Sequence, residues 1–207
     1  DGIVDTLDGK NSDLEASFTV KSAFGRVKAH TDATRLSSGE VFGQVVLEDG
    51  DVAVATVDAS GVRGKVQIIS LSDGAVDADA NLDIKTLSVA NEALGATRIS
   101  AGGRTTNGAD AELEATLRSR NGTVGIAGTL SRSETEGIAA SIRYTLALVH
   151  AALNAKADGS ARIAVTPDGR FAGELGIDRG EAAQDEYRIS GVAGRTTFVR
   201  DPGGPLQ

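Results

Sequence analysis

Apolar and polar residues alternate along most of this chain, and this period of two restricts its fold more than any other feature. Between Asp13 and Lys21, for example, every second residue is apolar and the residues between them are polar or charged. Successive side chains of a β-strand point to opposite faces, so such a segment is expected to form a strand with one apolar face. A helical period of 3.6 residues is nearly absent.

Further alternating segments predict about a dozen strands. They lie at residues 26–33, 41–47, 52–57, 76–85, 111–118, 161–165 and 171–177, and Tyr187, Ile189 and Phe198 close the series. Turn signals separate several of them, at Glu48–Asp51, Asn121–Gly122 and Pro167–Gly169. Short turns of this kind connect antiparallel neighbours, so the predicted fold class is all-β, as a mostly antiparallel meander.

One segment, Tyr144–Ala157, fits two structures. Leu146, Val149 and Leu153 have helical spacing, and the segment is rich in alanine, the best helix former. The same residues also continue an alternation that begins at Ile142. A strand is favoured because the neighbouring segments are strands, and a helix is the alternative.

The apolar faces of these strands must be shielded from water, and the composition indicates which architecture could shield them. The chain has 26 Gly, 5 Phe and 2 Tyr but no Trp or Met, so a thick core anchored by large side chains is not expected. An elongated, folded-over sheet with an apolar interior, a β-trough or taco, needs less bulk. A β-sandwich or a β-solenoid is the alternative. The expected organisation is a lead-in at 1–12, a single repetitive β-domain at 13–199 that is a slice of a longer protein, and a linker-like tail at 200–207.

Charge and missing residue types exclude several functions. The net charge of -8 without a basic cluster argues against nucleic-acid binding, and no apolar run is long enough for a transmembrane helix. The chain has no Cys and only His30 and His150, so no metal centre and no cofactor are expected. Nucleotide-binding and nucleophile motifs are missing too, so no catalytic residue is assigned and the protein is not expected to be an enzyme. The acidic series Asp77–Asp83 is interpreted as a solvated outer face.

Two segments carry a resemblance to a known family. LEATLRSRNGTVGIAGTL at residues 113–130 and NAKADGSARIAVTPDGRFAGEL at residues 154–175 combine Ala/Gly-rich alternating strands with Asn-Gly and Asp-Gly turns. In this style the chain, from about Asp13 to Asp178, resembles the AsmA-like bridge proteins of Gram-negative cell envelopes, which include the TamB and YdbH types.

The resemblance implies a fold and a function. Such proteins fold a long sheet into a trough, are anchored by an N-terminal membrane helix, and carry phospholipid between the inner and outer membranes. This chain would be a periplasmic segment without that anchor, with phospholipid or fatty acyl chains, and an outer-membrane protein, as partners.

The larger residues of the apolar faces are the candidates for lining the lipid groove: Leu14, Phe18, Val20, Val45, Leu47, Val66, Ile68, Leu82, Ile84, Leu113, Leu117, Ile126, Ile163, Val165, Phe171, Leu175 and Ile177. The alternative is a secreted or cell-surface structural or adhesive β-module, in which the same residues form a closed, dry core.

Overall fold

The computed structural model describes residues 2–5, 11–54, 56–90, 92–106, 109–133, 135–150 and 152–201, and the regular elements in them are all β-strands. The strands are β1 (Gly2–Asp5), β2 (Ser12–Ser22), β3 (Gly25–Arg35), β4 (Val41–Val54), β5 (Val57–Ser70), β6 (Val76–Val89), β7 (Glu92–Thr105), β8 (Asp110–Ser119), β9 (Gly122–Ser133), β10 (Gly137–His150), β11 (Leu153–Val165), β12 (Phe171–Gln184) and β13 (Tyr187–Arg200). The all-β prediction is confirmed.

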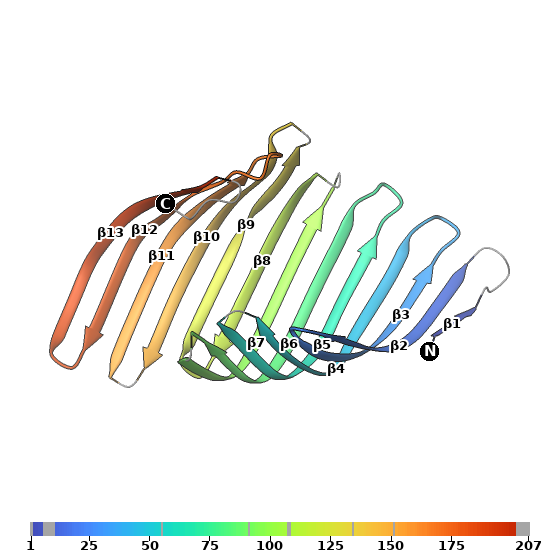
Figure 1. The fold of residues 1–207 in the computed structure, drawn as a ribbon, viewed down its shortest axis with the longest axis horizontal. Coiled ribbons are helices and arrows are strands. Elements are labelled where there is room, and N and C mark those ends of the chain that lie inside the picture. Colours follow the sequence, from blue (N-terminus) through green and yellow to red (C-terminus); the bar gives the residue numbers. More distant parts are fainter. Residues whose placement is uncertain are drawn as a thin grey trace. The chain divides into compact units, whose positions relative to one another are not determined.

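The chain divides into two compact units. The first holds residues 1–108 and Leu117–Arg120, and the second holds Ala109–Thr116 and residues 121–207, so β8 contributes to both. In the first unit β1 to β7 lie side by side in chain order, and each pairs antiparallel with the next. In the second unit β9 to β13 do the same (Figure 1). The predicted antiparallel meander is therefore also confirmed.

Each unit is a single layer. The described strands that pair within a unit belong to one sheet, which excludes a β-sandwich of two packed sheets inside either unit. The antiparallel pairing likewise differs from the parallel coils of a β-solenoid. In both units, one face of the sheet therefore has no second layer from the same unit to cover it.

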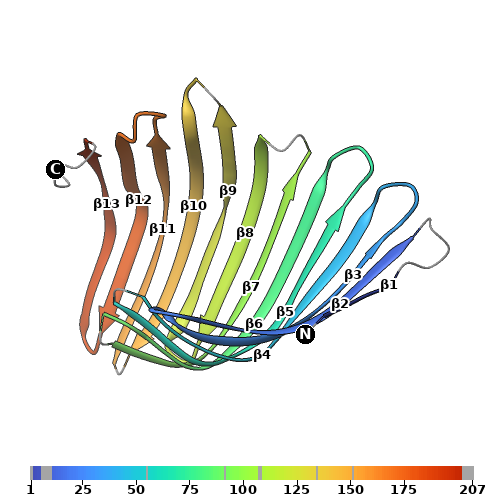
Figure 2. The same ribbon diagram turned by 45° about the vertical axis from the view of Figure 1, so that its right-hand side comes forward.

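The strands of the first unit bend at a row of β-bulges. In β6, Lys85 and Thr86 together lie opposite Ala96 of β7, and in β4 Glu48 is an extra residue with no partner in β3. Gly61 in β5 has a φ of 61°, a conformation that favours glycine. Bulges bend a strand and increase its twist, and β4 to β7 curve strongly in both views (Figures 1 and 2).

The small core of the first unit lies along this bend. Ala29, Ile84, Leu87 and Thr97, from β3, β6 and β7, are 1–6% exposed, whereas Lys85 between two of them is exposed. The bend therefore turns one face inward and the other outward. Apart from Ala75, the described chain has no further buried apolar side chain, as expected for a single layer built from small residues.

The turn predicted at Glu48–Asp51 is wrong. These residues lie inside β4, which continues to Val54, and the chain reverses only after it. The Glu-Asp-Gly-Asp sequence accommodates the β4 bulge instead, and Gly50 is buried there, close to Val27 and Val62. A bulge and a tight turn both favour glycine beside acidic residues, so the local sequence does not separate them.

The other predicted turns are confirmed. β9 begins at Gly122, directly after Asn121, and residues 166–170 form the turn between β11 and β12. In that turn Thr166 Oγ1 donates to Asp168 Oδ1, and the backbone N–H of Arg170 donates to the same oxygen at 3.5 Å. These two hydrogen bonds lower the pKa of the Asp168 carboxyl from its usual value.

The ambiguous segment Tyr144–Ala157 is β-structure and not a helix. It comprises the end of β10 and the start of β11, paired in register from Tyr144 opposite Gly159 to His150 opposite Leu153. The expected lead-in at 1–12 contains β1. In the expected tail at 200–207, β13 ends at Arg200, and residues 202–207 lie outside the described residues.

Candidate functional site

The strand register gathers apolar residues on one face of the first unit. Leu14 lies opposite Ala33, which lies opposite Gly43, and the row continues through Ile68 to Ala78. A second row runs from Phe18 through Ala29, Leu47 and Gly64 to Leu82 and Ile99. Residues directly opposite one another share a face of the sheet. We call this surface, from β2 to β7, the apolar face of the first unit.

The second unit has an apolar face of the same kind. One row joins Leu130, Ala140, Ile163, Gly173 and Phe198 across β9 to β13. The next row along the strands joins Gly128, Ile142, Ala161, Leu175 and Thr196.

Two aromatic rings lie over glycines on the apolar face of the second unit. Tyr144 covers Gly159 and donates its hydroxyl hydrogen to Gly176 O at 2.9 Å. Phe198 covers Gly173 and stacks on Phe171, with 5.4 Å between ring centroids. A Cβ at either glycine would lie under 3 Å from the ring above it. The glycines therefore leave room for the rings to lie against the backbone.

Charge separates the two faces of each unit. The register places uncharged residues on the apolar faces of the described strands β2–β7 and β9–β13. Charged residues occur there only among the first two or last two residues of a strand. This holds through the bulges, because the apolar series steps from Leu47 to Gly50 and from Ile84 to Leu87, over three residues instead of two. The opposite surface, which we call the charged face, holds the ionic side chains.

Ion pairs between neighbouring strands cover the charged face. In the first unit Arg98 Nε lies 2.7 Å from Asp83 Oδ1, and Arg104 Nε lies 3.4 Å from Asp77 Oδ1. In the second unit Arg195 pairs with Glu174 at 3.1 Å. The acidic series Asp77–Asp83 is thus partly neutralised by β7, in agreement with its interpretation as an outer face. Exposed pairs of this kind contribute little to stability, about 0–1 kcal/mol each.

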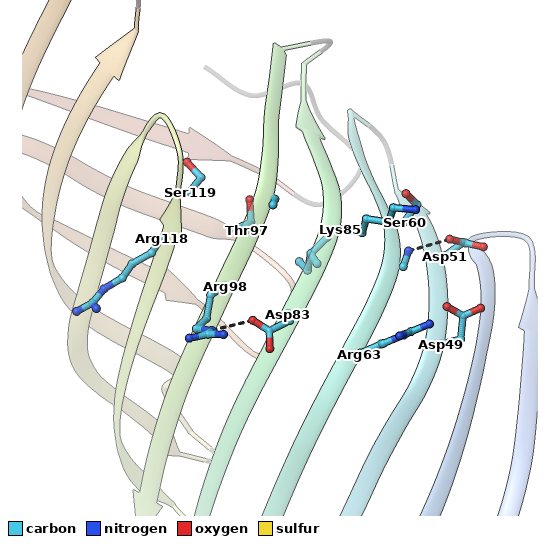
Figure 3. A pocket seen from close by; sticks show the side chains of 13 residues that line it. Asp49, Asp51, Ser60, Arg63, Asp83, Lys85, Thr97, Arg98, Arg118 and Ser119 are labelled. Atoms are coloured by element: carbon cyan, nitrogen blue, oxygen red, sulfur yellow. Dashed lines mark hydrogen bonds and ion pairs between the residues drawn. The ribbon is translucent and has the colours of Figure 1, made fainter.

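A hollow of about 910 Å³ lies beside the bulges and is lined largely by charged side chains. Asp49, Arg63, Asp83 and Arg98 lie around it (Figure 3), and Asp51 Oδ1 accepts a hydrogen bond from the Gly61 N–H at 3.1 Å. Acidic and basic groups alternate along its wall, so it has no single sign of charge to select an ion.

Close to the hollow, Lys28 Nζ lies 2.5 Å from Glu48 Oε2. This hydrogen bond, reinforced by the charge of Lys28, lowers the pKa of Glu48. The pair shows that the bulge residue Glu48 is held on the charged face and not on the apolar one.

The structure places most of the predicted lining residues on the two apolar faces. In the first unit the register brings together Leu14, Phe18, Val20, Val45, Leu47, Val66, Ile68, Leu82 and Ile84. In the second it brings together Ile126, Ile163, Val165, Phe171, Leu175 and Ile177. Leu113 and Leu117 share a face of β8 but fall in different units. Ile84 is buried, whereas Leu14, Phe18, Val20, Ile68, Ile126 and Leu175 are 37–52% exposed.

A second cluster, on the charged face of the first unit, was not predicted. Glu15 lies directly opposite Asp32 and Ser17 directly opposite His30, across β2 and β3. One ligand atom from each of Glu15, His30 and Asp32 lies within 4.8 Å of the others. The period-two spacing places Glu15 and Ser17 on one face of their strand, and His30 and Asp32 on one face of theirs. Only the pairing of the two strands brings these residues together.

No family model matches this chain, and comparisons with curated proteins and with solved structures also give no match. Among the described residues, no helix is long and apolar enough to cross a membrane.

Proposed function

We propose that the apolar faces bind acyl chains, and that the chain is a periplasmic segment of a bridge-like lipid transport protein of the Gram-negative envelope. In this proposal phospholipids move between the inner and outer membranes with their acyl chains against the sheet and their headgroups in water. The resemblance to the AsmA-like proteins suggests the periplasmic location and the transport between the two membranes. The binding of acyl chains is supported by the surface itself.

The observation that carries the proposal is the uncharged apolar surface of each unit, which no second layer of that unit covers. A charged side chain inside such a face would lose its hydration when an acyl chain covered it, which costs free energy unless the charge is paired. Transferring a methylene group from water to an apolar surface contributes about 0.8 kcal/mol. A long acyl chain therefore gains several kcal/mol without any catalytic or specific polar group.

The kind of apolar residue favours acyl chains over a protein partner. Protein interfaces are enriched in Trp, Tyr, Phe and Met, which fill pockets on the partner. This chain has no Trp or Met and is only 3% aromatic, and two of its aromatic rings lie over glycines. An aliphatic surface suits a flexible hydrocarbon chain, which adapts to it by rotation about its own bonds.

The deciding experiment is mass spectrometry of an organic extract of the protein, expressed in a Gram-negative host and purified without detergent. Phospholipid or fatty acid in stoichiometric amounts is the expected result. Retention of the lipid through gel filtration distinguishes a bound ligand from carry-over.

Adjacent positions on opposite faces of β11 provide matched variants. Ile163 lies on the apolar face, and Ala164 lies on the charged face, exposed. We expect Ile163→Arg to remove the lipid bound by the second unit and Ala164→Arg to retain it, with the same circular-dichroism signal for both. Val66→Arg and Gln67→Arg are the equivalent pair on β5 of the first unit.

Two results would overturn the proposal. If Ile163→Arg and Val66→Arg each bind as much lipid as the unmodified protein, the apolar faces are not the binding surface. If the protein is free of lipid, melts cooperatively and takes up no phospholipid from vesicles, the apolar face is closed in solution, and a structural module with a dry interior is the better explanation.

A further inference from the structure

We propose that Glu15, His30 and Asp32 form a zinc-binding site that joins β2 to β3 on the charged face of the first unit. The site lies on the opposite side of the sheet from the proposed lipid surface. Zinc binding there therefore does not depend on the proposed lipid transport. Imidazole nitrogen and carboxylate oxygens are ligands that Zn²⁺ accepts, and a catalytic or labile zinc site commonly uses three protein ligands and one water.

The distances suit zinc. His30 Nε2 lies 3.0 Å from Asp32 Oδ1 and 3.8 Å from Glu15 Oε1. Two ligands of a tetrahedral zinc ion, each at about 2.0–2.1 Å, are separated by about 3.3 Å. The two separations from His30 bracket this value, and the ligand atoms of Glu15 and Asp32 lie within 4.8 Å of each other, so side-chain rotations can bring all three around one ion. With side chains 27–67% exposed, the site is open to metal and to a water ligand.

The strand pairing gives a physical reason for a cation here. Glu15 and Asp32 are carboxylates directly opposite each other on neighbouring strands, a pairing that destabilises a sheet. His30 lies beside both of them, and a divalent ion held by all three groups would turn this repulsion into a link between the strands.

Ser17 supplies the second contact that a ligating histidine needs. Its Oγ lies 3.0 Å from His30 Nδ1. Without metal, Nε2–H donates to Asp32 and the Ser17 hydroxyl donates to Nδ1. With zinc on Nε2 the ring proton resides on Nδ1, and the same hydroxyl oxygen accepts it. A serine serves both states because its hydroxyl both donates and accepts, and such contacts fix the orientation of metal-bound histidines.

The test is a titration of the tag-free full chain with ZnCl₂ followed by calorimetry and by thermal melting. We expect one zinc ion to bind per chain and the melting temperature to rise, because the site is assembled only in the folded sheet. Calcium should not compete, since it takes oxygen ligands in place of imidazole. Replacing ligands by His30→Ala, Glu15→Gln or Asp32→Asn should each weaken binding at least tenfold.

Matched variants make the assignment specific. Ser17→Ala should weaken binding by roughly 10- to 100-fold while leaving all three ligands in place. His150→Ala removes the only other histidine, and Asp83→Asn removes a carboxylate of the charged face outside the cluster, so both should bind zinc as the unmodified protein does. The proposal is overturned if no saturable binding occurs into the millimolar range, or if binding persists unchanged in His30→Ala while that variant retains its β-sheet circular dichroism.

Discussion

At the scale of single residues, glycine decides how closely neighbouring strands approach. Gly64 in β5 has a φ of 153°, and a Cβ there would lie 2.1 Å from the backbone oxygen of Asn81 in β6. Gly43 in β4 lies on the same face but has ordinary backbone geometry, and the nearest atom to its Cβ position is 3.8 Å away. The two positions look alike in the sequence and differ only in the folded sheet.

Gly64→Ala is therefore expected to destabilise the first unit by about 1–3 kcal/mol, because both the backbone conformation and the contact with β6 oppose a side chain. Gly43→Ala is the matched control and is expected to stay within about 0.5 kcal/mol of the unmodified protein. Urea unfolding measured by circular dichroism compares the two. Equal stabilities would contradict the close approach of β5 and β6 at Gly64.

At the scale of single elements, the bulges keep the apolar face continuous where the sheet bends. The extra residue in β6 lets Ile84 and Leu87 both face inward although three positions separate them. A regular strand would send Leu87 and the residues in phase with it to the charged face.

Deleting Thr86 removes this bulge. The deletion leaves Leu87 two positions after Ile84, so the apolar residues of a regular strand stay in phase on one face. We expect the melting temperature to fall nonetheless, because the strand loses the bulge that bends it along the core. Deleting Ser38, in the turn between β3 and β4, is the control and should cost less, because that turn is exposed. Should the two deletions melt alike, the bulge in β6 would not contribute to the packing along the bend.

At the scale of the whole molecule, the folded chain leaves much of its surface in water. It exposes 13869 Å², whereas a compact monomer of 21.1 kDa exposes about 9,000 Å². Single layers of small side chains explain the excess, since each unit buries little apolar area. Stability therefore depends more on the backbone hydrogen bonds of long strands than on a core.

This excess predicts an unusually small dependence of the unfolding free energy on urea. The slope of that dependence scales with the area newly exposed on unfolding, and here much of the area is exposed already. We expect the slope to fall below that of a two-layer β-protein of similar length measured alongside. A slope as steep as that of the reference protein would show that the apolar faces are covered in solution.

The sequence by itself determined the strands and the division of residues between two faces. Alternation is a local property, so Leu14 to Val20, or Phe171 to Ile177, carry it without reference to the rest of the chain. The turns at Asn121–Gly122 and Pro167–Gly169 were predictable for the same reason, because their conformations depend on adjacent residues.

Only the tertiary structure decided where the alternation changes phase and which strands lie together. The Glu48–Asp51 segment is a bulge and not a turn because β3 and β5 both continue past it and pair with β4 on either side. Glu15 and His30 meet for a similar reason, since they lie on separate strands and their proximity follows from register alone. Contacts between strands depend on residues distant in the sequence, and a period of two, being the same in every strand, does not encode them.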